Sequence, residues 1–312
     1  MEADPELMSR RPYVWKLAHR ELLCGERTLV MGVVNVTPDS FSDGGKYQDP
    51  DRAFARAIEL EEQGADLIDV GAESTRPGST RISEGEELRR LIPVLKRLRG
   101  KLTVPVSVDT YKSAVAEKAL EHGAEIINDP SGLTFDAQLA RTVANHNAGL
   151  IINHMRGAPE TWAKLPPLKD VMGAIRHDLD ASVHRAVRSG VDRARIVIDP
   201  GLGFGKRKEQ NAEILARLGE LATLELPILT GPSRKSFLPK PDDGPAPLLD
   251  CATAAAVTAA IFGGTHIVRV HDVAGIKLAA QLADQVLSFV GTSDSNAFRA
   301  GSSRSAGSPS RR

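Results

Sequence analysis

The chain has 312 residues, of which 41% are hydrophobic, so it can bury a sizeable core. Basic and acidic residues number 40 each, and this balance does not favour nucleic acid or an anionic membrane as a partner. The sequence lacks both an apolar run of about 18 residues that could span a membrane and the apolar segment of a secretory signal, so we expect a globular protein of the cytoplasm.

Short β-branched runs alternate with longer helical runs through most of the chain. Each short run is almost continuously apolar, as expected for parallel strands that are buried on both faces. The expected strands are residues 28–36, 65–71, 105–110, 125–130, 149–154, 195–200, 227–231 and 266–271. The expected helices are residues 50–63, 84–99, 111–122, 135–147, 171–189, 209–221, 249–262 and 273–290. Eight such units predict a single (β/α)8 TIM barrel over residues 25–290, with a doubly wound sheet as the structural alternative.

The two ends of the chain do not follow this repeat. Residues 1–24 are an N-terminal extension in which Tyr13 and Trp15 predict a short strand or hairpin that closes one end of the domain. Residues 291–312 are rich in Ser, Gly and Arg, and this composition predicts a disordered C-terminal tail. The two cysteines are too few for a disulfide framework, and Cys251, among alanines, is expected to be a small buried side chain.

Most of the predicted strands end in a polar or charged residue. In a barrel the carboxyl ends of all strands meet at one face, where barrel enzymes place their active sites. One such residue alone could simply cap the next helix, but the whole set predicts a site. Its members are Asn35, Asp69, Asp109, Asn128, Asp129, Asn153, His154, Asp199, Ser233, Arg234, Lys235, Arg269 and His271.

The charges in this set are sorted along the chain. Carboxylates and amides dominate the second to sixth strands, whereas cations follow the last two strands and occur at Arg76 in the loop after the second strand. This arrangement fits a ligand with a donor-rich heterocyclic edge and an anionic, phosphate-like end. Two loops, 35–47 and 73–83, are rich in Pro, Ser and Gly and are expected to act as mobile lids. The GLGFGK run at 201–206 is not a nucleotide-binding motif.

Seven motifs give the sequence its resemblance to the dihydropteroate synthase family. They are MGVVNVTPDSFSDGG (31–45), IDVGAESTRPG (68–78), VSVDT (106–110), IINDPSG (126–132), IDPGLGFGK (198–206), PSRKS (232–236) and VRVHDV (268–273). The resemblance covers roughly residues 25–290 and implies a (β/α)8 pterin-binding transferase of folate biosynthesis. The implied reaction condenses (7,8-dihydropterin-6-yl)methyl diphosphate with 4-aminobenzoate, and it releases 7,8-dihydropteroate and diphosphate. Sulfonamides block this step by mimicking 4-aminobenzoate.

The resemblance also implies a role for individual residues. The pterin would be bound by Asp109, Asn128, Asp199 and Lys235. The diphosphate would be bound by Asn35, Thr75, Arg76, Arg269 and His271. The aminobenzoate would lie among Phe41, Thr75, Pro77, Phe204 and Ser236, with Ser236 at the start of the seventh helix. The catalytic residues would be Asp43, Arg76, Lys235, Arg269 and His271. Asn35 would bind Mg²⁺, and the protein would be a homodimer acting on small molecules.

Two other functions are compatible with a pterin-binding barrel. A methyltetrahydrofolate-dependent methyltransferase shares the barrel and the pterin carboxylates, but it has no diphosphate to bind and so no need for the STRPG, SRK and RVH motifs together. A catalytically inactive paralogue should have lost residues from the loops. The family also often has two glycines where Gly71 and Ala72 stand, and its usual link to the seventh helix lacks the proline-rich run at 238–250.

Overall fold

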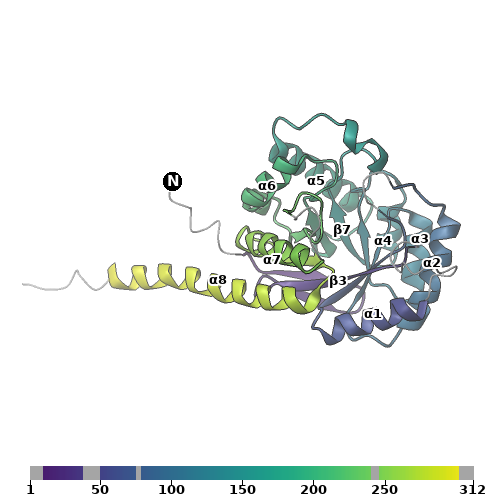
Figure 1. Cartoon of the computed structure of the whole chain (residues 1–312), viewed down its shortest axis with the longest axis horizontal. Helices are drawn as coiled ribbons and strands as arrows, with labels where there is room; N and C mark the ends of the chain where they lie inside the picture. The colour runs from purple at the N-terminus through teal and green to yellow at the C-terminus, as the bar shows by residue number, and fades with distance from the viewer. Residues whose placement is uncertain (1–9, 38–49, 75–78, 240–245, 302–312) are drawn as a thin grey trace, which may run out of the picture.

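Eight parallel strands form a barrel that helices surround (Figure 1) in the computed structural model, which describes residues 10–37, 50–74, 79–239 and 246–301. The barrel strands are β3 (Leu29–Asn35), β4 (Leu67–Gly71), β5 (Val106–Asp109), β6 (Ile126–Asp129), β7 (Gly149–Asn153), β8 (Ile196–Asp199), β9 (Leu229–Thr230) and β10 (Ile267–Val270). The strands follow one another in chain order from β3 to β8, and β10 lies between β9 and β3. A parallel bridge between Ile198 and Ile228 joins β8 to β9 and completes the ring. The predicted (β/α)8 barrel is confirmed, and the doubly wound sheet is excluded.

Every predicted helix is present. The α-helices are α1 (Pro50–Glu62), α2 (Glu84–Leu98), α3 (Ser113–Glu121), α4 (Leu139–Asn145), α5 (Val171–Arg188), α6 (Lys208–Ala216), α7 (Ala246–Phe262) and α8 (Val273–Gly301). Short 3-10 helices cover Pro159–Lys164, Arg193–Arg195 and Leu218–Leu224. The last of these replaces the end of the sixth predicted helix, which stops as an α-helix at Ala216. Among the described residues, no helix is long and apolar enough to cross a membrane.

The N-terminal extension closes the barrel at the amino-terminal ends of its strands, as predicted. Strands β1 (Tyr13–Lys16) and β2 (Glu21–Cys24) form an antiparallel hairpin. Trp15 is fully buried among inward-facing side chains of the barrel strands, and its Nε1 donates to the carbonyl of Arg195 at 2.9 Å. Gly149 makes room for the hairpin, because a Cβ at this position would lie 2.5 Å from a methyl group of Leu17.

The C-terminal tail begins later than predicted. Figure 1 shows α8 lying along α7 and projecting beyond the barrel, and its backbone remains helical to Gly301. The prediction of disorder from residue 291 is therefore wrong for residues 291–301. Adding a residue to an existing helix is far easier than starting one, and Ala297, Arg299 and Ala300 are good helix formers.

Cys251 is exposed, so the prediction that it is buried is wrong. It lies on α7, a helix with small apolar residues on most sides. Such a sequence has almost no amphipathic pattern, and periodicity therefore does not indicate which side faces the barrel. Cys24 is buried in the hairpin, and both cysteines are free thiols.

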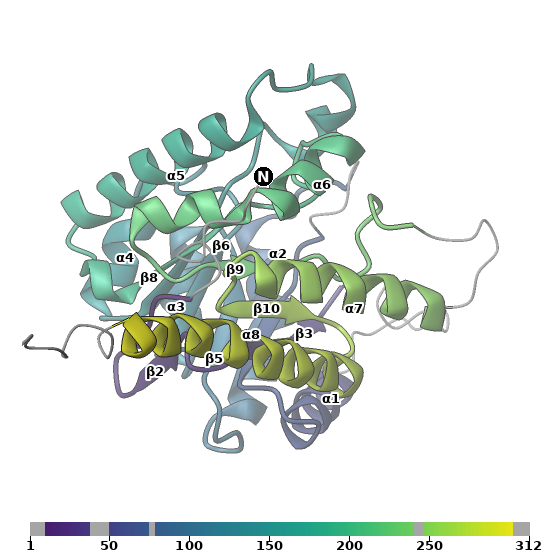
Figure 2. The same ribbon diagram turned by 90° about the vertical axis from the view of Figure 1, so that its left-hand side faces the viewer.

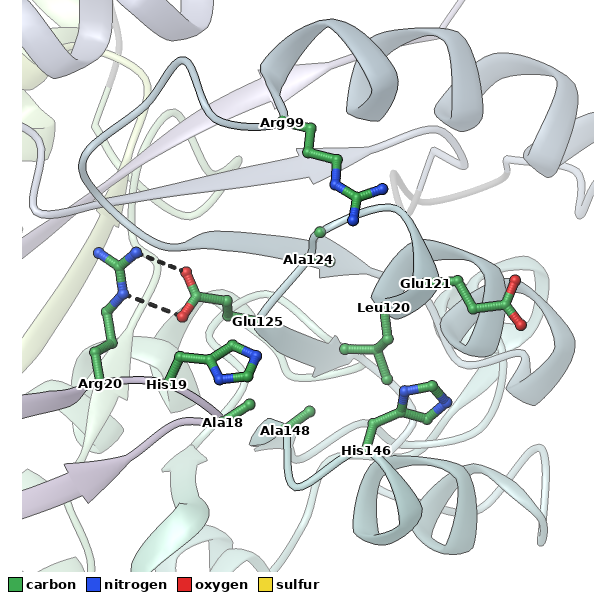
Figure 3. A pocket seen from close by; sticks show the side chains of 11 residues that line it. Ala18, His19, Arg20, Arg99, Leu120, Glu121, Ala124, Glu125, His146 and Ala148 are labelled. Atoms are coloured by element: carbon green, nitrogen blue, oxygen red, sulfur yellow. Dashed lines mark hydrogen bonds and ion pairs between the residues drawn. The ribbon is translucent and has the colours of Figure 1, made fainter.

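A cavity of about 350 Å³ lies beside the hairpin, at the amino-terminal end of the strands (Figure 3). Its lining includes His19, Arg20, Arg99, Glu125 and His146. Arg20 and Glu125 face each other and form an ion pair of 3.0 Å. None of the predicted site residues lines this cavity.

Candidate active site at the carboxyl ends of the strands

The predicted pterin residues lie together at the opposite end of the barrel. The strands that carry them belong to one sheet, in the order β10, β3, β4, β5, β6, β7 and β8, and Figure 2 shows this sheet behind α7 and α8. One small cavity of about 20 Å³ touches seven polar, charged or aromatic side chains, which are Asp109, Asn128, Asn153, Asp199, Phe204, Lys235 and Arg269. The sequence places these residues on five strands and two loops, and the parallel barrel alone brings them to one point.

Arg269 reaches across the barrel mouth from β10 to two carboxylates. Its Nε donates to Asp69 Oδ2 at 2.6 Å, and its Nη2 donates to Asp109 Oδ2 at 2.9 Å. Burial opposes the charged guanidinium, yet Asp69 and Asp109 raise the pKa of Arg269 above its usual value. Burial raises the pKa of Asp109 to about 7, and the neighbouring Asp69 adds to the increase. Arg269 is therefore the counterion that allows two carboxylates to share the mouth.

Two asparagines present oxygen atoms to the same region. Asn128 Nδ2 donates to Asp69 Oδ2 at 3.2 Å, and Asn153 Nδ2 donates to the carbonyl of Pro130 at 2.9 Å. Both partners can only accept, so the amide nitrogens must face them. The Oδ1 of Asn153 is buried and has no hydrogen-bond partner among the described residues. An acceptor left in this state favours a ligand that donates hydrogen bonds.

Asp199 is held by the glycine loop that follows β8. Its Oδ1 accepts a hydrogen bond of 2.7 Å from the backbone N–H of Gly201, and burial raises its pKa to about 6. Gly201 and Gly203 have φ angles of +69° and +83°, in the left-handed region that favours glycine. Beneath the loop, Lys206 Nζ donates to the carbonyls of His154, Pro200 and Gly201 at 2.6–2.8 Å. Lys206 thus fixes the loop that presents Asp199.

Lys235 and Phe204 form the side of the mouth next to Asp199. The Nζ of Lys235 lies 4.1 Å from the centre of the Phe204 ring, a distance typical of a cation–π contact. A Cβ at Gly203 would lie 3.1 Å from the Lys235 side chain, so this glycine allows the lysine to approach. Burial, and after it the charge of Arg269, lowers the pKa of Lys235 to about 8. A cation and an apolar ring therefore lie side by side.

His271 lies beyond Arg269 and is neutral at pH 7. Its Nδ1 is 2.9 Å from Ser233 Oγ, and its backbone N–H also donates to that oxygen. Burial lowers its pKa to about 3, and the cations Arg269, Arg234 and Lys235 contribute to the decrease. In this state His271 can donate one hydrogen bond, and an approaching anion would favour its protonation.

Asn35, at the end of β3, lies near Asp109, with Gly71 of β4 between them. A Cβ at Gly71 would be in van der Waals contact with both, 3.5 Å from the Cβ of Asp109 and 3.9 Å from Asn35 Oδ1. Amide and carboxylate oxygens suit Mg²⁺, which commonly takes few protein ligands and shares its shell with phosphate and water. No group of three or more His, Cys, Asp or Glu side chains among the described residues could hold a metal by itself. The residues present fit Mg²⁺ only together with an anionic substrate.

Several predicted site residues fall outside the described part of the chain. They are Phe41 and Asp43 in the first loop and Thr75, Arg76 and Pro77 in the second. Ser236 is described, and the prediction that it begins the seventh helix is wrong. It lies in an exposed turn, and α7 begins only at Ala246. Prolines at 239, 241 and 245 separate the two, and each removes a backbone donor that a helix needs.

Three residues of this site are absent from the roles implied by the family resemblance. Asp69 and Asn153 belong to the strand-end set that predicts the site, but the resemblance assigns them no role. Lys206 gives no comparable signal, because its three carbonyl partners are known only once the glycine loop is folded.

Comparison with known proteins agrees with this geometry. A model of the family described as pterin binding enzymes matches residues 31–271. The dihydropteroate synthases of Synechocystis sp. and Bacillus subtilis are each 44% identical to the chain, and the alignments cover 83% and 84% of it and 90% of each relative. A Clostridium difficile dihydropteroate synthase, solved in the presence of pteroic acid, is 43% identical with a TM-score of 0.79, covering 84% of this chain and 98% of that one. The Xanthomonas albilineans enzyme with 4-aminobenzoic acid is 38% identical with a TM-score of 0.81, covering 88% and 98%.

The barrel and the polar residues at its mouth define a pterin-binding enzyme, and the chain belongs to that family. Its relatives narrow the assignment. Within the family, the chain belongs to the dihydropteroate synthases, which are transferases of folate biosynthesis. The resemblance identified from the sequence motifs is thus confirmed.

Proposed function

We propose that this chain condenses (7,8-dihydropterin-6-yl)methyl diphosphate with 4-aminobenzoate and releases 7,8-dihydropteroate and diphosphate. The observation that carries the proposal is the set of buried acceptors around one cavity, with cations on one side of it. Asp109, Asn128, Asn153 and Asp199 offer oxygens to the donor-rich edge of a pterin. Arg269 and His271 lie where an anionic leaving group would be attached to that ring.

Arg269 connects pterin binding to the chemistry. It reaches across the mouth while it pairs with Asp69 and Asp109, and it lines the cavity that Asp109, Asn128 and Asp199 share. Pterin N–H groups would replace the guanidinium as hydrogen-bond donors to Asp109, and the guanidinium would turn to the diphosphate. Binding the ring thereby frees the cation that the reaction needs.

The bond between the pterin methylene carbon and the diphosphate oxygen breaks first in this proposal. Negative charge then builds on the diphosphate, and Arg269 and His271 stabilise it. The aryl amine is neutral and nucleophilic at pH 7, so it needs no strong base to attack the methylene carbon. Asp43 in the first loop would favour the cationic pterin intermediate. Arg76 and Thr75 would close on the diphosphate from the second loop.

Mg²⁺ is part of the proposal. Asn35 would hold it beside Asp109, since an amide oxygen and a carboxylate near each other suit this ion. The ion would supply further positive charge to the leaving diphosphate. Phe204 and Lys235 would bind the ring of 4-aminobenzoate, with Phe41, Pro77 and Ser236 around it.

We also propose a homodimer in the cytoplasm. One face of α8 exposes four large apolar side chains, Leu278, Leu282, Val286 and Phe289, of which Leu278 and Phe289 are each 69% exposed. Their spacing puts them on one side of the helix, and a two-fold axis would pair this stripe with its copy. The free thiols of Cys24 and Cys251 are compatible with a reducing compartment. Leu282→Arg should convert the dimer to a monomer in light scattering.

The reaction itself is tested by diphosphate release from purified protein. Release should require 4-aminobenzoate and Mg²⁺, and a sulfonamide should inhibit it. Pterin binding with no release would instead favour the inactive paralogue or the methyltransferase, and a methyl-transfer assay would separate those two.

A further inference from the structure

A buried ion cluster lies behind the candidate site, and no step of the proposed reaction uses it. Lys112, just before α3, donates to Glu73 Oε2 at 2.6 Å and to Glu87 Oε2 at 2.5 Å. The side chains are 10%, 9% and 1% exposed, respectively. Surface ion pairs contribute little to a structure, but charges as deeply buried as these are retained only when they are closely paired.

The cluster closes the base of the second loop. Glu73 lies just after β4 and Ile82 just before α2, so the two residues flank the segment 74–81. Glu73 Oε2 accepts from the backbone N–H of Ile82 at 3.1 Å, and Lys112 Nζ donates to the carbonyl of Ile82 at 2.9 Å. Within the segment itself, Ser79 Oγ donates to the carbonyl of Ser74 at 2.6 Å. The two ends of the segment are therefore tied together.

All three ammonium protons of Lys112 are used, by Glu73, Glu87 and the carbonyl of Ile82. Burial opposes the charge, but the two carboxylates raise the pKa of Lys112 above its usual value. Glu73 is also fully engaged, because Tyr111 donates to its Oε1 at 2.9 Å. The cluster therefore fixes its members in one arrangement.

The same cluster connects the second loop to the pterin side of the mouth. Tyr111 and Lys112 follow Asp109 after a single intervening residue, Thr110. The Tyr111 ring is held in turn by Phe135, with ring centroids 5.2 Å apart at an angle of 88°. A shift of Glu73 or Ile82 relative to the end of β5 would break their hydrogen bonds with Tyr111 and Lys112.

We propose that Lys112, acting through Glu73, is a positioning residue that fixes Glu73 and Ile82, at the two ends of the second loop, relative to Asp109 and so controls use of 4-aminobenzoate. This inference rests on the proposed function, which assigns Thr75, Arg76 and Pro77 to that loop. It adds a residue that contacts neither substrate and affects one substrate more than the other.

The test uses Lys112→Met in the full-length protein, which keeps the aliphatic stem and removes the ammonium. We expect the KM for 4-aminobenzoate to rise at least tenfold, while the dissociation constant for the pterin substrate changes less than threefold. Lys118→Met is the matched control, since Lys118 lies on α3 and forms an exposed pair with Glu121. It should change neither constant.

A second variant covers the case in which Lys112→Met does not fold. Tyr111→Phe removes only the hydroxyl that donates to Glu73 and keeps the aromatic contact with Phe135. It should raise the same KM two- to fivefold. Thr75→Ala provides a coupling test: if Lys112 acts through the loop, the double variant Lys112→Met/Thr75→Ala should lose much less than the product of the two single losses.

Two outcomes would overturn the proposal. One is a folded variant with unchanged KM for 4-aminobenzoate, and the other is an equal loss for both substrates with multiplicative double-variant effects. Amide hydrogen exchange of residues 72–82 does not depend on activity. It should accelerate at least tenfold in Lys112→Met and not in Lys118→Met, even if the wild-type protein released no diphosphate. Failure of the proposed function is therefore distinguishable from failure of this inference.

Discussion

The two ends of the barrel differ in how their polar groups are satisfied. At the amino-terminal end the hairpin fills the barrel, and Arg20 and Glu125 pair with each other beside a cavity of about 350 Å³. At the carboxyl end, described residues line a cavity of about 20 Å³. There Asp109 and Asp199 have raised pKa values, and Asn153 keeps an oxygen without a partner among the described residues. Of these two cavities the larger lies at the amino-terminal end, whereas the raised carboxylates and the unpartnered oxygen of Asn153 lie at the carboxyl end. Unsatisfied polarity, rather than the volume of these cavities, marks the candidate site.

The largest effect is expected at Arg269. Arg269→Ala removes the cation next to the leaving group and leaves Asp69 buried without its counterion. We expect kcat to fall about a thousandfold, with a much smaller change in binding of 4-aminobenzoate. Stopped-flow and equilibrium binding would separate the two, and an unchanged kcat would refute the role of Arg269.

At the amino-terminal end, substitution of Trp15 should affect stability rather than activity. Trp15→Ala leaves a cavity beneath the barrel and should cost about 3–5 kcal/mol of unfolding free energy. The kcat of the folded fraction should stay within about twofold, because the hairpin is far from the mouth. Leu23→Ala, on the exposed side of the same hairpin, should be nearly neutral in urea titration. A loss of kcat without loss of stability would contradict the view that the amino-terminal end takes no part in the reaction.

The pH dependence should report the raised carboxylates. Asp199 and Asp109 must be ionised to accept pterin N–H groups, with pKa values of about 6 and 7, and Lys235 loses its proton above about 8. The kcat/KM for the pterin substrate should therefore peak between about pH 7 and 8. It should fall about tenfold per unit well above pH 8, and about a hundredfold per unit well below pH 6, where both carboxylates take up a proton. A flat profile from pH 5.5 to 9 would contradict these environments.

The raised pKa of Asp199 also affects the stability of the folded protein. Because the folded-state pKa of Asp199 lies above its usual value, ionisation destabilises the folded state as pH rises. Asp199→Asn should abolish pterin binding and raise Tm, and the increase should be larger at pH 8 than at pH 4. An equal increase at both pH values would show that the charge is not the cause.

The smallest effect is expected at Arg20, next to the larger cavity. Its side chain is 38% exposed, so Arg20→Ala should cost about 1 kcal/mol or less. Steady-state assays should find kcat and both KM values unchanged. A tenfold loss of activity would mean that the amino-terminal cavity takes part in the reaction.

Local pattern was enough to predict the strands and the place of the site. Continuous apolar runs identify buried parallel strands, and the barrel then brings residues such as Asp109, Asn128 and Asp199 to one face. Long-range pairing is different. The hydrogen bond from Arg269 to Asp69 has no sequence signature, and neither do the three carbonyl partners of Lys206. Both sets of contacts depend on backbone positions that only the fold determines. Ser236, α8 beyond residue 290 and Cys251 show that helix boundaries and helix faces are also weakly encoded where small residues or prolines dominate.

The hydrogen bond between Trp15 and Arg195 has a consequence for protein synthesis. The two residues are 180 positions apart, so at about 5–20 residues per second the ribosome makes the hairpin roughly 9–36 s before its partner exists. During that interval the indole and Leu17 have no barrel to enter. Nascent chains should therefore carry an exposed apolar hairpin until the sixth barrel strand emerges.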